Sequence, residues 1–275
     1  MNALNLIKSS ALFFCLTGAS QAGLWFKIPN AQDELTEYGH SSKSLLNPKS
    51  INVMVWNQYK GKERTWRREF ERLSRNQDVL ILQEATDDRK MTKVYDTSRD
   101  FQFFMGTSFI YRFGNKATGV VSAAKVAASD ILAQRSRGVE IAGGTPKMIL
   151  FASYPIAGTC HELLTVNIHA LNSVTWQTLA AQLLDALKVV ESHQGPVVFG
   201  GDFNTWSKKK MEYMKHIMHK YSLEEVHFKN SHLKMKVFGR ELDHVFTRGL
   251  NVREASVEKS TGADHQPLFL TLEVR

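Results

Sequence analysis

The sequence predicts an α/β fold in one domain, because apolar strands and amphipathic helices alternate along it. Residues 51–57 and 78–84 form apolar runs of strand length, and the segment between them, residues 63–75, has the apolar spacing of a helix. Hydrophobic residues make up 43% of the 275 positions and charged residues 23%, which is enough to bury one large core. We find no repeat of fixed period and no linker that would divide the chain.

The N-terminus predicts an export signal over residues 1–22. Lys8 precedes an apolar run at residues 11–16, and small residues lead up to Ala22, where we expect cleavage. The protein is therefore expected to be exported and to reside in a periplasm or outside the cell. Residues 23–50 contain few apolar side chains, so we expect an extended lead-in over the surface, with regular structure and the single domain, residues 51–275, beginning at Ile51.

The remaining elements follow from apolar periodicity. A helix is expected at residues 173–190, capped by Asn172 or Ser173 and ended by a Gly-Pro pair, and another at residues 207–221. Further strands are expected at residues 101–105, 119–123, 148–153, 163–169, 242–247 and 267–274, and a short one that begins at Val197 and runs into the glycine pair at residues 200–201.

Polar residues of one chemical kind follow these strands. The clearest case is the apolar strand that runs into a glycine pair and then presents Asp202 and Asn204 two residues apart. One such residue is usually part of an ordinary turn, but six sets are hard to obtain by chance. They are Asn57, Glu84, Asn167 with His169, Asp202 with Asn204, Asp243 with His244, and Asp264 with His265.

These side chains suit a divalent-metal site of the oxygen type. Carboxylate and carboxamide oxygens favour Mg²⁺, with Mn²⁺ as the alternative, over zinc. Glu84 can bind the ion directly, and Asp202, held by Asn204, can orient and deprotonate a water molecule. His265 with Asp243 behind it can stay protonated and stabilise charge on a phosphoryl oxygen.

From residue 51 onward the chain resembles the endonuclease/exonuclease/phosphatase superfamily. The first strand ends in Val-Trp-Asn at Asn57, the second in Gln-Glu at Glu84, and Gly-Asp-Phe-Asn spans residues 201–204. Leu-Asp-His follows at residues 242–244, and Asp-His-Gln-Pro at residues 264–267 matches the family ending except that an alanine replaces its serine.

The resemblance implies a four-layer α/β sandwich, with two facing mixed β-sheets flanked by helices, and metal-assisted phosphoester hydrolysis at one rim. It assigns Asn57, Glu84 and Asp264 to the metal site. Catalytic roles fall on His169, as proton donor to the leaving oxygen, and on Asp202, Asn204, Asp243 and His265.

The charge pattern favours nucleic acid as the substrate. The formal net charge is +8 and the pI about 9.4, and lysines directly follow the Gly-Asp-Phe-Asn motif. We therefore assign substrate binding to Lys208, Lys209 and Lys210, although such a run is more often a solvated helix face. An exported nuclease, monomeric and without an obligate protein partner, is the leading hypothesis. The alternatives are a phospholipid or small-molecule phosphoesterase, which would expose aromatic loops, and a catalytically silent binding module.

Overall fold

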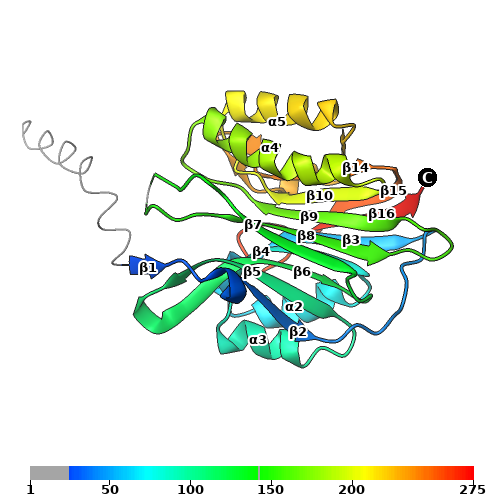
Figure 1. Ribbon diagram of the computed structural model, residues 1–275, viewed down its shortest axis with the longest axis horizontal. Coiled ribbons are helices and arrows are strands. Elements are labelled where there is room, and N and C mark those ends of the chain that lie inside the picture. Colours follow the sequence, from blue (N-terminus) through cyan, green and yellow to red (C-terminus); the bar gives the residue numbers. More distant parts are fainter. Residues whose placement is uncertain (1–24, 142) are drawn as a thin grey trace, which may run out of the picture.

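Two β-sheets face each other between two pairs of helices, so the chain forms the predicted four-layer sandwich (Figure 1). The computed structural model describes residues 25–141 and 143–275. The expected signal peptide over residues 1–22 lies outside the described residues. In the part of the chain that is described, no helix combines the length and apolar character needed to cross a membrane.

The first sheet has eight strands in the order β1-β5-β6-β4-β3-β16-β15, with β2 paired to β5. Its central strands β3 and β4 run parallel, and its other pairings are antiparallel. The strands are β1 Phe26–Lys27, β2 Leu35–Gly39, β3 Ile51–Asn57, β4 Val79–Thr86, β5 Gln102–Tyr111, β6 Lys116–Ala124, β15 Leu250–Val257 and β16 Leu268–Val274.

The second sheet has six strands in the order β11-β14-β10-β9-β8-β7, and again its central pair, β9 and β10, is parallel. A separate two-stranded hairpin joins β12 to β13. The strands are β7 Asp130–Arg135, β8 Met148–Pro155, β9 Glu162–His169, β10 Val197–Asp202, β11 Glu224–Glu225, β12 Lys236–Val237, β13 Arg240–Glu241 and β14 Asp243–Arg248.

The central strands are apolar on both faces because each face is covered. In β3, Val53 and Val55 pack between the sheets, whereas Met54 and Trp56 pack towards the helices. The first sheet is covered by α2 Trp66–Ser74 and α3 Arg89–Asp96, and the second by α4 Trp176–Ser192 and α5 Lys208–Lys220.

Some sequence expectations about local structure were wrong. Regular structure does not begin at Ile51, because β2 lies in the lead-in and pairs with β5 through the register Leu35↔Gly106. The cap of α4 is Thr175, whose hydroxyl accepts the N–H of Thr178, rather than Asn172 or Ser173. The strands β7 and β15 and the helix α3 were not predicted, since they have more exposed or mixed faces than the central strands.

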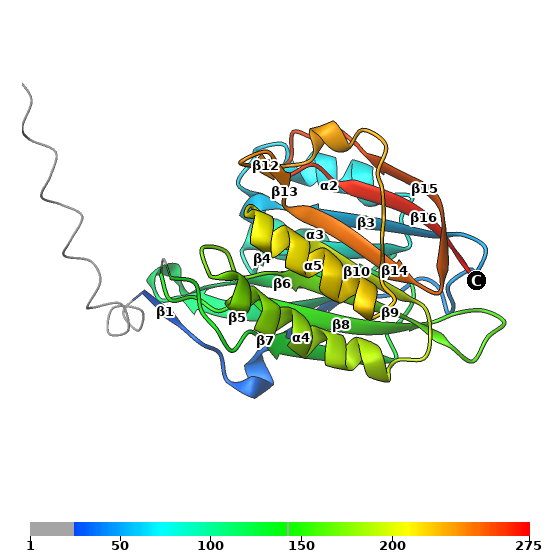
Figure 2. The same ribbon diagram turned by 90° about the horizontal axis from the view of Figure 1, so that it is seen from above.

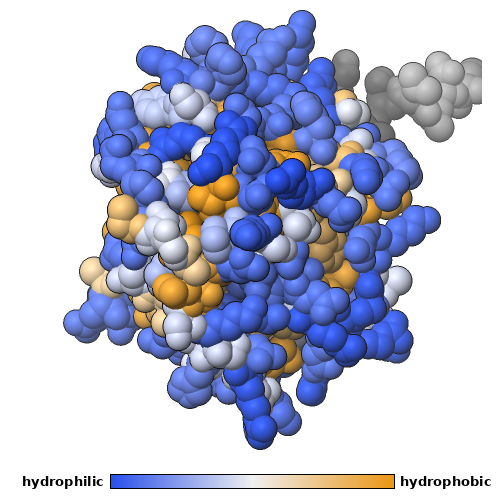
Figure 3. All heavy atoms as spheres, turned by 90° about the vertical axis from the view of Figure 1, so that its right-hand side faces the viewer, coloured by the Kyte–Doolittle hydropathy of each residue, from blue (hydrophilic) through white to orange (hydrophobic). Residues whose placement is uncertain are grey.

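The parallel strands of both sheets end at one end of the molecule. In Figures 1 and 2 this is the left-hand end, where the β5–β6 and β7–β8 connections and the β12–β13 hairpin also lie. Figure 3 shows the opposite end, which is mainly hydrophilic with smaller hydrophobic groups between. The polar residues predicted at strand ends therefore gather at the left-hand end.

Candidate active site

Three of the predicted catalytic residues lie in one row across the second sheet. Asp202, at the end of β10, is paired with His169 of parallel β9 on one side and with Asp243 of antiparallel β14 on the other. Ligand atoms of Asp202, Asp243 and His265 all lie within 4.8 Å of one another. Strand register thus brings together His169, Asp202 and Asp243, which are far apart in the sequence, and the loop before β16 adds His265.

The glycine before Asp202 is required by close backbone approach. Gly201 has a φ of +144°, and a Cβ there would lie 2.0 Å from the carbonyl oxygen of Ile168. No other residue fits without moving β9 away from β10. Gly201 therefore keeps the two strands, and with them Asp202 and His169, in register.

The Asp202 carboxylate is buried and held from two sides. Its Oδ2 accepts a hydrogen bond from Asn57 Nδ2 at 3.1 Å, which crosses from the first sheet, and its Oδ1 accepts the backbone N–H of Asn204 at 3.0 Å. Burial raises the pKa of Asp202 to about 7. A carboxylate that titrates near neutrality is well matched to removing a proton from water.

His265 is a buried imidazole held by Asp243. Its Nδ1 lies 2.7 Å from Asp243 Oδ2, and its Nε2 lies 4.0 Å from Asp202 Oδ2. Burial acts to lower the pKa of His265, but the Asp243 carboxylate outweighs it and raises the pKa to about 10. The ring is therefore an imidazolium at neutral pH. The main-chain oxygen of His265 accepts a 3.0 Å hydrogen bond from Trp56 Nε1, which fixes the loop to β3.

His169 reaches the same centre from β9. Its Nε2 lies 3.8 Å from Asp202 Oδ2, and the residue is buried. Burial, with the neighbouring charges of Lys147, His265 and Lys60, lowers the pKa of His169 well below its usual value. His169 therefore enters the site as a neutral ring that can donate an N–H hydrogen bond.

Glu84 and Asp264 bring further carboxylates to this end. Glu84 has a φ of +53° where the pairing of β4 with β6 shifts register, a backbone conformation that is uncommon for a non-glycine residue within a strand. Burial raises the pKa of Asp264, and the nearby charge of Glu84 raises it further. The charge of Glu84 also acts to raise the pKa of Asp202, so Glu84 is close enough to repel both of these carboxylates.

This donor set fits a hard divalent cation. Mutual repulsion among carboxylates is relieved by a bound cation, and Glu84 and Asp264 are the less buried members of the set. Asn57 already uses its side-chain oxygen to accept the backbone N–H of Tyr59 at 3.1 Å and its amide to hold Asp202. The structure therefore shows Asn57 orienting Asp202.

Asn204 and Lys210 shape the loop after β10. Asn204 has a φ of +50°, and its amide donates to the carbonyl of Ala170 at 2.9 Å. Lys210 is only 1% exposed, with Nζ 3.5 Å from the Asn204 carbonyl oxygen and 4.7 Å from the ring centroid of Trp206. Burial lowers the pKa of Lys210 to about 8.

The three lysines assigned to substrate binding therefore differ. Lys208 and Lys209 are exposed at the start of α5, and Lys208 lies 3.7 Å from Glu212 in an ion pair. Lys210 instead packs against the loop that carries Asn204, so it supports this loop rather than extending into solvent.

Sequence reasoning missed the polar link behind the site. Asn167 donates through Nδ2 to the carbonyls of Leu82 and Val121, at 3.1 and 2.9 Å, and accepts from Gln83 Nε2 at 2.8 Å. Asn167 thus ties the second sheet to β4 next to Glu84. In the Gln-Glu pair at residues 83–84 the sequence predicts a role for Glu84, but nothing in it indicates that Gln83 bonds to Asn167.

A second missed contact lies on the other side of Glu84. Lys60 Nζ lies 3.1 Å from the hydroxyl of Tyr111. Burial acts to lower the pKa of Lys60, but the hydrogen bond to Tyr111 and the charge of Glu84 raise it overall. A positive charge thus lies near Glu84.

Comparison with known proteins shows the family of this chain. Residues 54–265 match the Endonuclease/Exonuclease/phosphatase family. The chain belongs to this family. It is also 33% identical over 224 residues to the UPF0294 protein of Vibrio campbellii, an alignment that covers 80% of this chain and 77% of the relative.

Solved structures of the family share the fold. An endonuclease/exonuclease/phosphatase family protein from Leptotrichia buccalis has a TM-score of 0.61 and 15% identity, and the match covers 82% of this chain and 99% of that one. A mannosyl-6-phosphatase from Bacteroides thetaiotaomicron has a TM-score of 0.56 and 12% identity, covering 81% and 99%. The chain is a phosphoesterase of this superfamily, whose members typically use divalent metal ions.

Proposed function

We propose that this protein is an exported, Mg²⁺-dependent phosphodiesterase that hydrolyses nucleic acid. The observation that carries the hydrolytic part is the facing pair in the core of the site: Asp202, whose pKa is raised to about 7, and the imidazolium of His265, held by Asp243. One group can take a proton from water and the other can stabilise the negative charge that then builds on phosphorus-bound oxygen.

Each side chain has a defined task in this proposal. Asp202, oriented by Asn57, positions the attacking water and accepts its proton. His265, whose Nδ1 is held by Asp243, donates one hydrogen bond through Nε2 to a phosphoryl oxygen. Neutral His169 keeps its proton and donates an N–H hydrogen bond to the leaving oxygen. Glu84 and Asp264 would hold the divalent ion, which supplies Lewis-acid stabilisation of phosphoryl charge when bound.

Positive charge supports nucleic acid as the substrate. The chain carries a net charge of +8, with Lys60 beside Glu84 on one side of the site and Lys208 and Lys209 on the other. Cations on both sides of a phosphodiester site suit a polyanion that extends past it. The expected signal over residues 1–22 supports export.

The direct test is incubation of the purified mature protein with single- and double-stranded DNA and with RNA, at low salt, with Mg²⁺ or with chelator. We expect cleavage that requires the metal and weakens as salt rises. Hydrolysis of bis(4-nitrophenyl) phosphate without cleavage of any nucleic acid would disprove the proposed nuclease activity. The proposed phosphodiesterase activity would still stand.

One observation favours a phospholipid as a second candidate substrate. Phe113, between β5 and β6, is 96% exposed, and Phe238, at the turn of the β12–β13 hairpin, is 81% exposed. Both connections lie at the end of the molecule that carries the site (Figures 1 and 2). Co-sedimentation with phospholipid vesicles and release of a phosphorylated headgroup would establish this alternative; neither is expected of the nuclease.

A further inference from the structure

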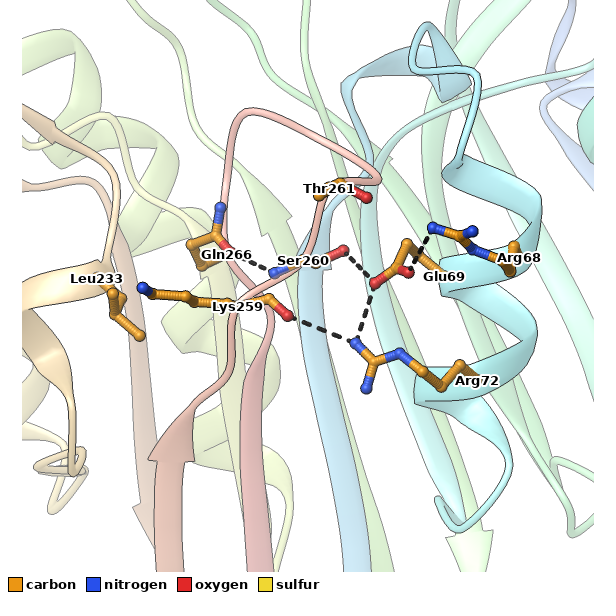
Figure 4. Close-up of a pocket in the computed structure, with 8 residues that line it drawn as sticks. All are labelled: Arg68, Glu69, Arg72, Leu233, Lys259, Ser260, Thr261 and Gln266. Atoms are coloured by element: carbon orange, nitrogen blue, oxygen red, sulfur yellow. Dashed lines mark hydrogen bonds and ion pairs between the residues drawn. The ribbon is translucent and has the colours of Figure 1, made fainter.

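A hollow of about 550 Å³ lies on the flank of the molecule, outside the set of residues described above (Figure 4). It is bounded by α2 on one side, by the segment after β15 on another, and by the short helix that contains Leu233. Its lining residues are Arg68, Glu69, Arg72, Leu233, Lys259, Ser260, Thr261 and Gln266.

The charge of this pocket is positive. Three cations, Arg68, Arg72 and Lys259, line the pocket against one carboxylate, that of Glu69. Arg68 and Arg72 form ion pairs with Glu69, whereas the Lys259 side chain points away from it towards Leu233 (Figure 4). Just outside the lining, Glu258 adds a second carboxylate 3.7 Å from Arg72. The Arg68 side chain is 75% exposed and that of Arg72 is 49% exposed, so both remain accessible to a ligand. The pocket is therefore suited to an anion.

Glu69 organises the pocket. Its side chain is 10% exposed, and it accepts hydrogen bonds from Arg72 at 3.0 Å and from the Ser260 hydroxyl at 3.2 Å. Burial acts to raise the pKa of Glu69, but these hydrogen bonds, chiefly the one from Arg72, lower it overall. Glu69 therefore stays charged and fixes a guanidinium group in place before any ligand arrives, which reduces the entropy lost on binding.

One wall of the pocket belongs to the loop that carries the catalytic histidine. The Ser260 N–H donates to Gln266 Oε1 at 2.6 Å, and Thr65, just before α2, donates through its hydroxyl to the Thr261 carbonyl at 2.5 Å. These contacts close residues 260–266 into a compact loop with Asp264 and His265 within it. Gln266, which lines the pocket, directly follows His265 in the chain, so an anion in the pocket would contact the same loop that carries the catalytic histidine.

We propose that this pocket binds a second phosphate of the substrate, next to the phosphodiester held at Asp202 and His265. Arginine offers paired N–H donors that match two phosphate oxygens, and the pocket presents two arginines and a lysine. The inference rests on the proposed function and narrows its substrate to molecules with more than one phosphate, foremost a polynucleotide. A substrate with a single phosphate, such as a phosphocholine headgroup, cannot occupy both positions.

The test uses the double variant Arg68→Gln/Lys259→Gln, which leaves the Arg72–Glu69 pair intact. Its control is Arg67→Gln/Lys220→Gln, which removes the same charge from exposed positions outside the pocket, one of them on the same helix. Steady-state kinetics are measured for a single-stranded oligonucleotide and for bis(4-nitrophenyl) phosphate, which carries one phosphate. Melting temperatures establish that each variant is folded.

We expect KM for the oligonucleotide to rise about tenfold in the pocket variant, equivalent to about 1.4 kcal/mol of binding. Its kinetics on bis(4-nitrophenyl) phosphate should match wild type, and the control should affect the oligonucleotide much less. An equal change on both substrates, or an equal change in the control, would overturn the inference. A folded variant with wild-type KM for the oligonucleotide would overturn it too.

Two further experiments are needed. The first asks whether the pocket recognises phosphate regardless of the molecule that carries it, and the second tests the pocket if the proposed function fails. If inositol hexakisphosphate competes with the oligonucleotide in wild type but less in the pocket variant, the pocket recognises phosphate whatever its carrier. If wild type cleaves no nucleic acid, the proposed function fails, and the pocket is then judged by calorimetry with inorganic pyrophosphate. Weaker binding by the pocket variant supports the site, and unchanged binding refutes it.

Discussion

Replacing Asp243 by asparagine should lower the upper pH limit of activity, because it lowers the pKa of His265. In wild type, Asp202 must be ionised and His265 protonated. With pKa values of about 7 and about 10, activity should rise through pH 7 and fall near pH 10. The Asp243 carboxylate, 2.7 Å from His265 Nδ1, is the largest of the charges that raise the pKa of His265.

The size of the effect follows from that pKa. The rise from 6.5 to about 10 amounts to about 5 kcal/mol in favour of the imidazolium, at about 1.4 kcal/mol per pH unit. The charges of Asp202 and Asp264 also contribute and remain in the variant. We therefore expect Asp243→Asn to lower the alkaline pKa by about two units, which leaves about a tenth of the wild-type protonated fraction at pH 9.

The assay is kcat/KM for bis(4-nitrophenyl) phosphate with Mg²⁺ across the alkaline range, with the His265 ring followed by NMR. Glu225→Gln is the matched control, because it removes a carboxylate from another buried histidine, His244, 3.0 Å away. In the control, kcat/KM should fall at the same alkaline pH as in wild type. An unchanged alkaline limb in Asp243→Asn, with the fold intact, would refute the role given to the Asp243–His265 pair.

Two predictions concern stability. Asn167→Ala should reduce the free energy of unfolding by about 3 kcal/mol, because it removes the buried hydrogen bonds that join Asn167 to Gln83, Leu82 and Val121. A loss below about 1 kcal/mol in urea denaturation would contradict this. Burial acts to raise the pKa of Glu225, but its hydrogen bonds with His244 and Lys215 lower it to about 2. The stability that ionised Glu225 gives the folded protein is therefore complete above pH 4.5 and is lost as pH falls towards 2. Glu225→Gln should therefore cost about 1–3 kcal/mol at neutral pH and progressively less below pH 4.5, and a cost independent of pH would contradict the ionised pair.

The fold was predictable where both faces of a strand are buried. The strands that carry Asn57, Glu84 and Asp202 contain long apolar runs. Each delivers its polar residue at or near its C-terminal end to one edge, because the strands in each sheet's central pair are parallel. The strand β2 was missed because its residues are half exposed and its pairing partner, β5, lies far along the chain. Periodicity does not report such long-range pairing.

The site was predictable as a set of residue types but not as a set of contacts. Sequence motifs indicated Asp243 and His265, whereas the strand register shows why Asp243 meets Asp202. The burial of Lys210 and the cross-sheet bonds of Asn167 depend on how the loop and the sheets pack. The pocket at Arg68 joins segments almost two hundred residues apart, so no local pattern could reveal it.

The measurement that tests the central claim most directly is hydrolysis by Asp202→Asn, which keeps the shape of the side chain and removes its ability to accept a proton from water. With Mg²⁺ at neutral pH, we expect kcat to fall at least about a hundredfold, or about 3 kcal/mol, for both bis(4-nitrophenyl) phosphate and DNA, while the melting temperature stays close to that of wild type. A folded Asp202→Asn protein with wild-type turnover would contradict the assignment of this site.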